Sequence, residues 1–151
     1  MILNQQHQVR VARPALESFL RGVKRELGLV GAELTVCLVS DRAMARLNQR
    51  FRKKKGPTDV LSFPAVSGRR PVRFLRRSSA ANSREARYLG DVAIAPATAR
   101  RYAKKHDRPL PSELRVLILH GVLHLLGYDH ETDRGEMDNI EQKLRKHFGL
   151  T

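Results

Sequence analysis

The segment from Leu114 to Leu126 limits the possible folds more than any other part of the chain, because it is apolar along almost its whole length. Its length and the Gly127 that follows it predict a helix with a C-terminal stop. A helix that is apolar on all sides needs cover from the rest of the chain on every face. We therefore expect this helix to lie at the centre of the fold, with the other elements packed around it.

The remaining elements are predicted from shorter patterns of apolar residues and from the Pro, Gly and Ser residues at their ends. Apolar residues recur at helical spacing in four further stretches, which are residues 14–27, 41–51, 96–106 and 137–148. Met44, Leu47 and Phe51 form the expected inner stripe of the second of these helices. Strands are expected over the first few residues and over residues 33–39, 58–63 and 88–95. Strands that come mainly before helices indicate one α+β domain over residues 1–151, a small sheet covered by helices.

Three histidines mark the end of the central helix and the turn after it, in the segment HGVLHLLGYDH from His120 to His130. His120 and His124 are four residues apart, so a helix carries both imidazoles on one face. Gly127 permits a chain reversal that returns His130 toward the first two. Three imidazole ligands leave one position of a tetrahedral zinc ion open for water, as in catalytic zinc sites. The spacing therefore predicts one metal ion, zinc by preference, while nickel and other divalent ions also suit three imidazoles.

Gly121 argues against one familiar use of this spacing. Metallopeptidases of the metzincin type share it but carry a glutamate directly after the first histidine, where it acts as the general base. Here Gly121 occupies that position. Peptide hydrolysis is therefore the weakest hypothesis, and the motif favours metal-assisted chemistry on another substrate.

Positive charge is concentrated in one part of the chain. Lys and Arg number 29 against 15 acidic residues, which gives a net charge of +14. Thirteen of the basic residues lie between Arg46 and Arg87, with only Asp59 and Glu85 to oppose them. A local excess of this kind favours a polyanionic partner, nucleic acid first and an anionic membrane second. A solvated arginine-rich surface without a partner is the alternative.

The candidate side chains for binding a nucleic acid follow from this distribution. They are Arg50, Arg52, Lys53, Lys54, Lys55, Arg69 and Arg70. Residues 65–87 hold seven arginines with little periodicity, which predicts a long basic loop inserted in the domain. Because aromatic side chains are few in this part of the chain, we expect contacts with the sugar-phosphate backbone of a nucleic acid more than base stacking.

Cysteine content and hydropathy indicate the compartment. The single cysteine, Cys37, lies in an apolar run and has no partner for an internal disulfide, which fits a reducing compartment. No secretory signal follows Met1, and no apolar run reaches the length of a membrane span. We therefore expect a cytoplasmic protein with no membrane partner.

Three blocks of the sequence resemble the YbeY endoribonucleases, a family of bacterial ribosomal RNA maturation factors. The blocks are Phe51-Arg52 followed by Pro57 to Pro64, then Leu89 to Val92, and then His120 to His130 with Glu136, Met137 and Glu141 on the next helix. The chain departs from the family pattern in its long basic loop and at residues 53–56, which lack an acidic residue often found there. The resemblance implies a small mixed sheet packed with helices around the metal-binding helix.

The resemblance also implies an activity, namely cleavage of single-stranded RNA in maturation of the 3′ end of small-subunit ribosomal RNA and in ribosome quality control. Ribosomal RNA, the small ribosomal subunit and ribosome-associated proteins are the partners that this implies. Carried over by position, His120, His124 and His130 match the metal ligands of the family, and Arg52 matches its functionally important arginine.

A zinc-dependent endoribonuclease is accordingly the favoured hypothesis. We expect Arg52 and the metal held by His120 to carry the catalysis, because the arginine fork can stabilise charge on two phosphate oxygens. Asp129 and Asp91 are candidates for orienting a ligand histidine, or else a turn residue and a residue at a strand end. The alternative function is a non-catalytic ribosome-assembly factor with structural zinc, which a fourth protein ligand would favour.

Overall fold

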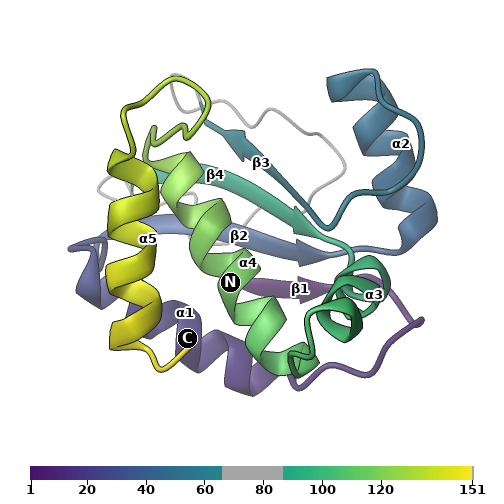
Figure 1. Cartoon of the computed structure of the whole chain (residues 1–151), viewed down its shortest axis with the longest axis horizontal. Coiled ribbons are helices and arrows are strands. Elements are labelled where there is room, and N and C mark those ends of the chain that lie inside the picture. The colour runs from purple at the N-terminus through teal and green to yellow at the C-terminus, as the bar shows by residue number, and fades with distance from the viewer. Residues whose placement is uncertain (66–86, 151) are drawn as a thin grey trace.

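Four strands form one mixed sheet in the computed structural model, which describes residues 1–65 and 87–150 (Figure 1). The strands are β1 (Ile2–Asn4), β2 (Ala32–Leu38), β3 (Val60–Pro64) and β4 (Arg87–Ile94), in the spatial order β1-β2-β4-β3. β1, β2 and β4 run parallel, and β3 pairs antiparallel with β4 at one edge. The predicted α+β class with a mixed sheet is confirmed. The predicted basic insertion at residues 65–87 lies, apart from its two end residues, outside the described residues.

Helices cover both faces of this sheet (Figure 1). They are α1 (Arg13–Glu26), α2 (Asp41–Arg52), α3 (Pro96–Lys105), α4 (Leu110–Leu125) and α5 (Glu136–His147). α1, α4 and α5 share one apolar core with the sheet, while α2 packs Met44 and Leu47 on the opposite face. α4 contacts α1, α3 and α5 as well as β3 and β4, so it holds the central position that its sequence predicts. In the described part of the chain, no helix has both the length and the hydropathy to cross a membrane.

α4 begins at Leu110 rather than at Leu114, where the sequence pattern placed its start. Pro111 lies in the first turn, and Pro109 is the residue before the helix. Proline is tolerated there because the first backbone N–H groups of a helix have no partner within the helix. The additional turn includes Glu113, which is buried and accepts a hydrogen bond from Arg108 at 2.8 Å.

Phe51 does not join the inner stripe of α2 as predicted. Its side chain is 40% exposed, whereas Met44 and Leu47 are buried. Phe51 lies in the last turn of α2 and meets Phe63 of the edge strand, with the two rings edge-on and their centroids 5.1 Å apart. No strand of the described residues lies beyond β3 to cover it. Helical spacing identifies the inner face of a helix, but it does not indicate where the sheet beneath that face ends.

Candidate metal centre

α4 and the turn that follows it bring His120, His124 and His130 together. Nε2 of His120 lies 3.1 Å from Nε2 of His124, and one nitrogen of each side chain lies within 4.8 Å of the other two. Two nitrogen ligands of a tetrahedral zinc ion are about 3.3 Å apart, so the three side chains fit such an ion with small adjustments. Among the residues that the structure describes, no other group of three His, Cys, Asp or Glu side chains is arranged in this way.

Gly127 makes the turn that returns His130 to the end of α4. Its φ angle of +97° lies in the left-handed region that other residues rarely adopt. The N–H of Gly127 donates to the His124 carbonyl at 3.0 Å, and the N–H of Tyr128 donates to the Leu123 carbonyl at 3.1 Å. These bonds close the helix at its C-terminus. The third histidine reaches the site because the helix ends at this glycine.

The surroundings of His124 favour its neutral form. Burial lowers the pKa of His124, and the charge of His120 lowers it further. A neutral imidazole keeps the nitrogen lone pair that a metal ion requires. The lowered pKa therefore makes His124 available as a ligand at neutral pH.

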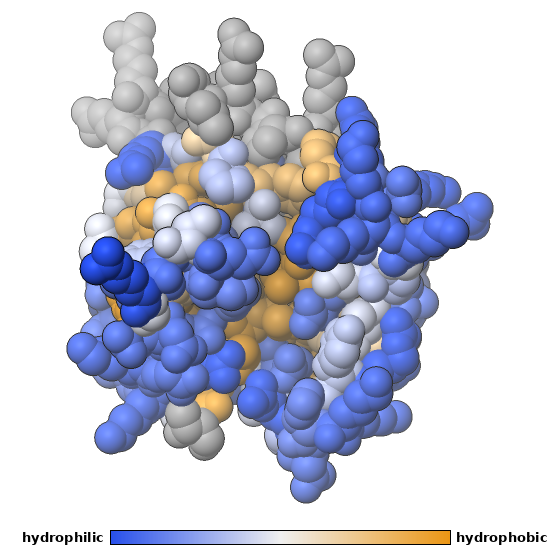
Figure 2. Space-filling view, turned by 45° about the horizontal axis from the view of Figure 1, so that its top comes forward, coloured by the Kyte–Doolittle hydropathy of each residue, from blue (hydrophilic) through white to orange (hydrophobic). Residues whose placement is uncertain are grey.

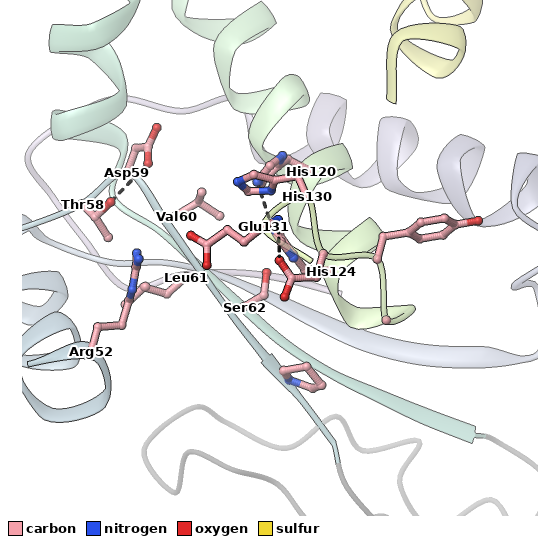
Figure 3. Close-up of a pocket in the computed structure, with 14 residues that line it drawn as sticks. Arg52, Thr58, Asp59, Val60, Leu61, Ser62, His120, His124, His130 and Glu131 are labelled. Carbon is pink, nitrogen blue, oxygen red and sulfur yellow. Dashed lines mark hydrogen bonds between the residues drawn. The ribbon is translucent and has the colours of Figure 1, made fainter. Parts of the chain in front are cut away.

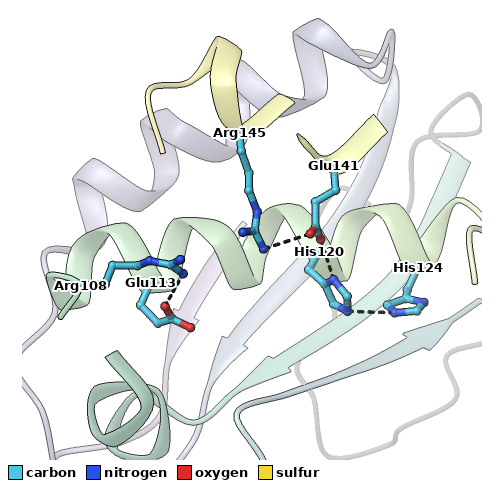
Figure 4. Close-up of polar contacts among 6 residues, drawn as sticks. All are labelled: Arg108, Glu113, His120, His124, Glu141 and Arg145. Atoms are coloured by element: carbon cyan, nitrogen blue, oxygen red, sulfur yellow. Dashed lines mark hydrogen bonds and ion pairs between the residues drawn. The ribbon is translucent and has the colours of Figure 1, made fainter. Parts of the chain in front are cut away.

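Glu141 is a residue of the site whose role the sequence analysis missed. Its Oε1 lies 2.6 Å from Nδ1 of His120, and its Oε2 accepts from Arg145 at 3.0 Å (Figure 4). Burial raises the pKa of Glu141, but the hydrogen bond and charge of His120 and the charge of Arg145 outweigh burial and lower it. The sequence contains a signal for this position, because Glu141 lies at helical spacing from Met137 and Leu144 on the buried face of α5.

The three histidines lie on one side of a pocket of about 540 Å³. Arg52 extends from the end of α2 into the same pocket, and Asp59 and Glu131 also line it (Figure 3). The other lining residues are Thr58, Val60, Leu61, Ser62, Pro64, Gly127, Tyr128 and Asp129. The pocket therefore combines imidazoles for a metal ion, a guanidinium for an anionic substrate, and carboxylates that can accept a proton.

Backbone and side-chain bonds at the end of α2 place Arg52 at the pocket. Lys53 has a left-handed φ of 56°, and its N–H donates to the Gln49 carbonyl at 3.1 Å. The buried side chain of Asn48 donates to the Gly56 carbonyl at 2.9 Å and ties the following loop back to α2. The chain then enters β3, whose residues line the pocket between Arg52 and the histidines (Figure 3).

Of the other predicted RNA-binding residues, those that the structure describes do not line this pocket. Four of them are exposed around the end of α2, namely Arg50, Lys53, Lys54 and Lys55. The other two, Arg69 and Arg70, lie outside the described residues. Figure 2 shows hydrophilic residues gathered on the α2 side of one face, with a hollow that has apolar residues on its floor beside them.

Asp129 and Asp91 were predicted either to orient a ligand histidine or to serve as a turn residue and a residue at a strand end, and the structure shows the following contacts for them. The carboxylate of Asp129 lines the pocket but accepts from the N–H of Glu131 at 3.0 Å, as a turn residue does. Asp91 is buried in β4 and accepts a hydrogen bond from the hydroxyl of Tyr88. The carboxylate in contact with His120 is that of Glu141, because α5 packs against α4 and neither aspartate lies on α5.

Gly121 packs so closely on the sheet that a larger residue does not fit. A Cβ atom at this position would lie 2.6 Å from Cγ1 of Val92 and 3.3 Å from Oγ of Ser62. The Ser62 hydroxyl also donates to the Gly121 carbonyl at 3.2 Å and joins β3 to α4. The glutamate that serves as general base in a metzincin-type peptidase therefore has no room after His120. This agrees with the sequence analysis, in which peptide hydrolysis is the weakest hypothesis.

Fold and site together define a small α+β domain with a three-histidine centre and a cationic side chain in one pocket, as expected of a hydrolase for an anionic substrate. The family profile described as Endoribonuclease YbeY matches residues 1–149, and the chain belongs to this family. The resemblance inferred from the sequence motifs is thereby confirmed. By its family, the chain is an endoribonuclease.

Individual relatives agree with this assignment. The chain is 39% identical to Endoribonuclease YbeY of Solibacter usitatus over 138 residues, which is 91% of this chain and 80% of that protein. It is 39% identical to the protein of the same name from Koribacter versatilis over 150 residues, covering 99% and 86% of the two chains. The solution structure of TM1509 from Thermotoga maritima is similar, with a TM-score of 0.63 and 26% identity over 99% of this chain and 90% of that one.

Proposed function

We propose that the chain is a zinc-dependent, single-strand-specific endoribonuclease that matures the 3′ end of small-subunit ribosomal RNA in the cytoplasm and contributes to ribosome quality control. The observation that carries this proposal is the pocket shared by Arg52 and the three histidines in a member of an endoribonuclease family. The small ribosomal subunit and ribosome-associated proteins are the proposed partners.

The pocket residues have separate roles in this proposal. His120, His124 and His130 would hold the zinc ion, which would supply Lewis-acid chemistry for the phosphate and for a water molecule. Arg52 presents a planar guanidinium to two phosphate oxygens and stabilises the charge that develops on them. The carboxylate of Glu131 extends from the turn beside His130 into the pocket and is placed to accept a proton (Figure 3).

Single-stranded RNA is the proposed substrate because of the shape and charge around the pocket. A single strand can bend its backbone into a pocket between side chains, whereas an A-form duplex is stiff and keeps its phosphates on the outside of a wide helix. The exposed lysines next to Arg52 attract the neighbouring phosphates without selecting a base sequence.

The open side of the metal centre favours an enzyme over a non-catalytic assembly factor with structural zinc. Structural zinc sites are closed by four protein ligands. In the part of the chain that the structure describes, this site offers three.

The test measures cleavage of a labelled single-stranded RNA that has the sequence of the 3′ end of small-subunit ribosomal RNA. A duplex of the same sequence is the comparison substrate. Zinc-loaded wild type is expected to cleave the single strand only, while folded His124→Ala is inactive because one ligand is missing. Equal cleavage by both proteins indicates a contaminating nuclease and removes the support for an enzyme. Salt-sensitive RNA binding without cleavage by wild type would favour the assembly factor.

A further inference from the structure

A buried carboxylate on α5 reaches the candidate metal centre from outside the lining of the pocket. Glu141 is 7% exposed, and both of its oxygens are engaged, Oε1 with Nδ1 of His120 at 2.6 Å and Oε2 with Arg145 at 3.0 Å (Figure 4). A buried carboxylate is costly unless it is paired and hydrogen-bonded. The contact to His120 is therefore a specific feature of this fold.

The contact determines which nitrogen of His120 can bind a metal ion. Nδ1 faces Glu141, and a carboxylate at that position keeps the proton on Nδ1. The lone pair then resides on Nε2, which lies 3.1 Å from Nε2 of His124. The carboxylate thus sets both the tautomer and the direction of the ring.

Arg145 prevents the carboxylate from turning away. It lies one helical turn after Glu141 on α5 and binds the second oxygen, so the carboxylate is held at both ends. Met137 and Leu144 are buried on the same face of α5 and fix the helix to the core that it shares with α4. The packing of α5 on α4 therefore positions all three side chains that are linked by these contacts, Arg145, Glu141 and His120.

We propose that Glu141 is a positioning residue of the metal centre, which orients Nε2 of His120 toward the ion and strengthens metal binding. This inference rests on the proposed function, in which the three histidines bind zinc. The competing interpretation is that Glu141 only joins α5 to α4. The chain offers a matched comparison in Glu113, which is also buried and paired with an arginine, Arg108 at 2.8 Å, but lies near the start of α4 (Figure 4).

The experiment compares the intact wild-type chain with Glu141→Gln, Glu141→Leu and Glu113→Gln. Zinc dissociation constants are measured by competition with a chromophoric chelator, and thermal unfolding is followed on the metal-free proteins. We expect Glu141→Leu to weaken zinc binding roughly 10- to 100-fold. Glu141→Gln should lose less, because its amide oxygen still accepts from Nδ1, and Glu113→Gln should bind zinc as wild type does. The visible spectrum of the cobalt(II)-loaded protein should change in Glu141→Leu only.

The possible results separate this inference from the function on which it rests. If wild type binds zinc and both Glu141 variants bind it equally well, the positioning role is wrong and the proposed function stands. If affinity falls in all three variants in proportion to the stability of the metal-free protein, Glu141 is only a helix contact. If wild type binds no zinc, the metal centre is wrong and the positioning role fails with it.

Discussion

The two sides of the pocket are built in opposite ways. The histidine wall, formed by His120, His124 and His130, depends on a buried helix, a glycine turn and a carboxylate from α5. On the other side, Arg52 lines the pocket, and Lys53, Lys54 and Lys55 are exposed next to it without lining it. These four residues, here called the basic wall, make no ion pair with any other described residue. Metal ligands must be placed to within a few tenths of an ångström, whereas phosphates are attracted over about 8–10 Å in physiological salt. The fold is thus needed to position the candidate metal ligands, while exposure alone would suffice for much of the proposed attraction of RNA.

Arg52 should be the exception within the basic wall, because it alone among the four residues lines the pocket. We expect Arg52→Ala to lower kcat on the order of 100- to 1,000-fold through loss of charge stabilisation in the transition state. Arg52→Lys should restore only part of the rate, because an ammonium lacks the bidentate fork. Single-turnover cleavage and zinc content would be measured together. A rise in KM with unchanged kcat would place Arg52 with the binding lysines.

Gly121→Ala tests how tightly the histidine wall is packed. The added Cβ would meet Cγ1 of Val92 at 2.6 Å, and such overpacking costs about 1–3 kcal/mol. The melting temperature should fall by roughly 2–10 °C. Gly31→Ala is the control, since a Cβ at Gly31 meets nothing within 4 Å. Equal melting temperatures for the two variants would show that α4 can shift away from the sheet at little cost.

Substitution of Lys54 and Lys55 by glutamine tests whether the exposed lysines of the basic wall contribute to RNA binding. RNA binding by the double variant, measured by anisotropy in the inactive His124→Ala background, should show a salt dependence weaker by about 1.4 in log–log slope. Zinc binding by the double lysine variant, measured with His124 intact, should equal that of wild type. The matched control replaces Lys104 and Lys105, which are exposed at the end of α3 and do not line the pocket. An equal loss from both pairs would mean that overall charge, and not the basic wall, attracts RNA.

Asp133 lies in the turn that joins the histidine wall to α5, and its substitution should have the smallest of these effects. Its carboxylate accepts from the N–H groups of Gly135 and Met137, and these bonds lower its pKa from the ordinary value of 3.8. The stabilisation is therefore present above that value and is lost as pH falls through the folded-state pKa. We expect Asp133→Ala to melt slightly below wild type at neutral pH and equally at strongly acidic pH. A difference that persists in acid would assign the effect to packing.

The parts of the site that follow from local spacing were predictable from the sequence. His120 and His124 share a face because they are four residues apart on a helix, and Gly127 marks the reversal that returns His130. Glu141 shares the helical spacing of the buried face of α5, but nothing in that pattern shows which residue of α4 it meets. Phe51 has the spacing of a core residue and is nevertheless exposed at the sheet edge.

The sequence by itself determined the trio of histidines, the central helix and the concentration of positive charge, because these depend on periodicity, turn chemistry and composition. Only the tertiary structure decided that Arg52 faces the histidines across one pocket and that Glu141, not Asp91 or Asp129, binds His120. The reason is that such contacts join elements distant in the chain. Their partners are set by how α2, α4 and α5 pack on the sheet, which no local pattern records.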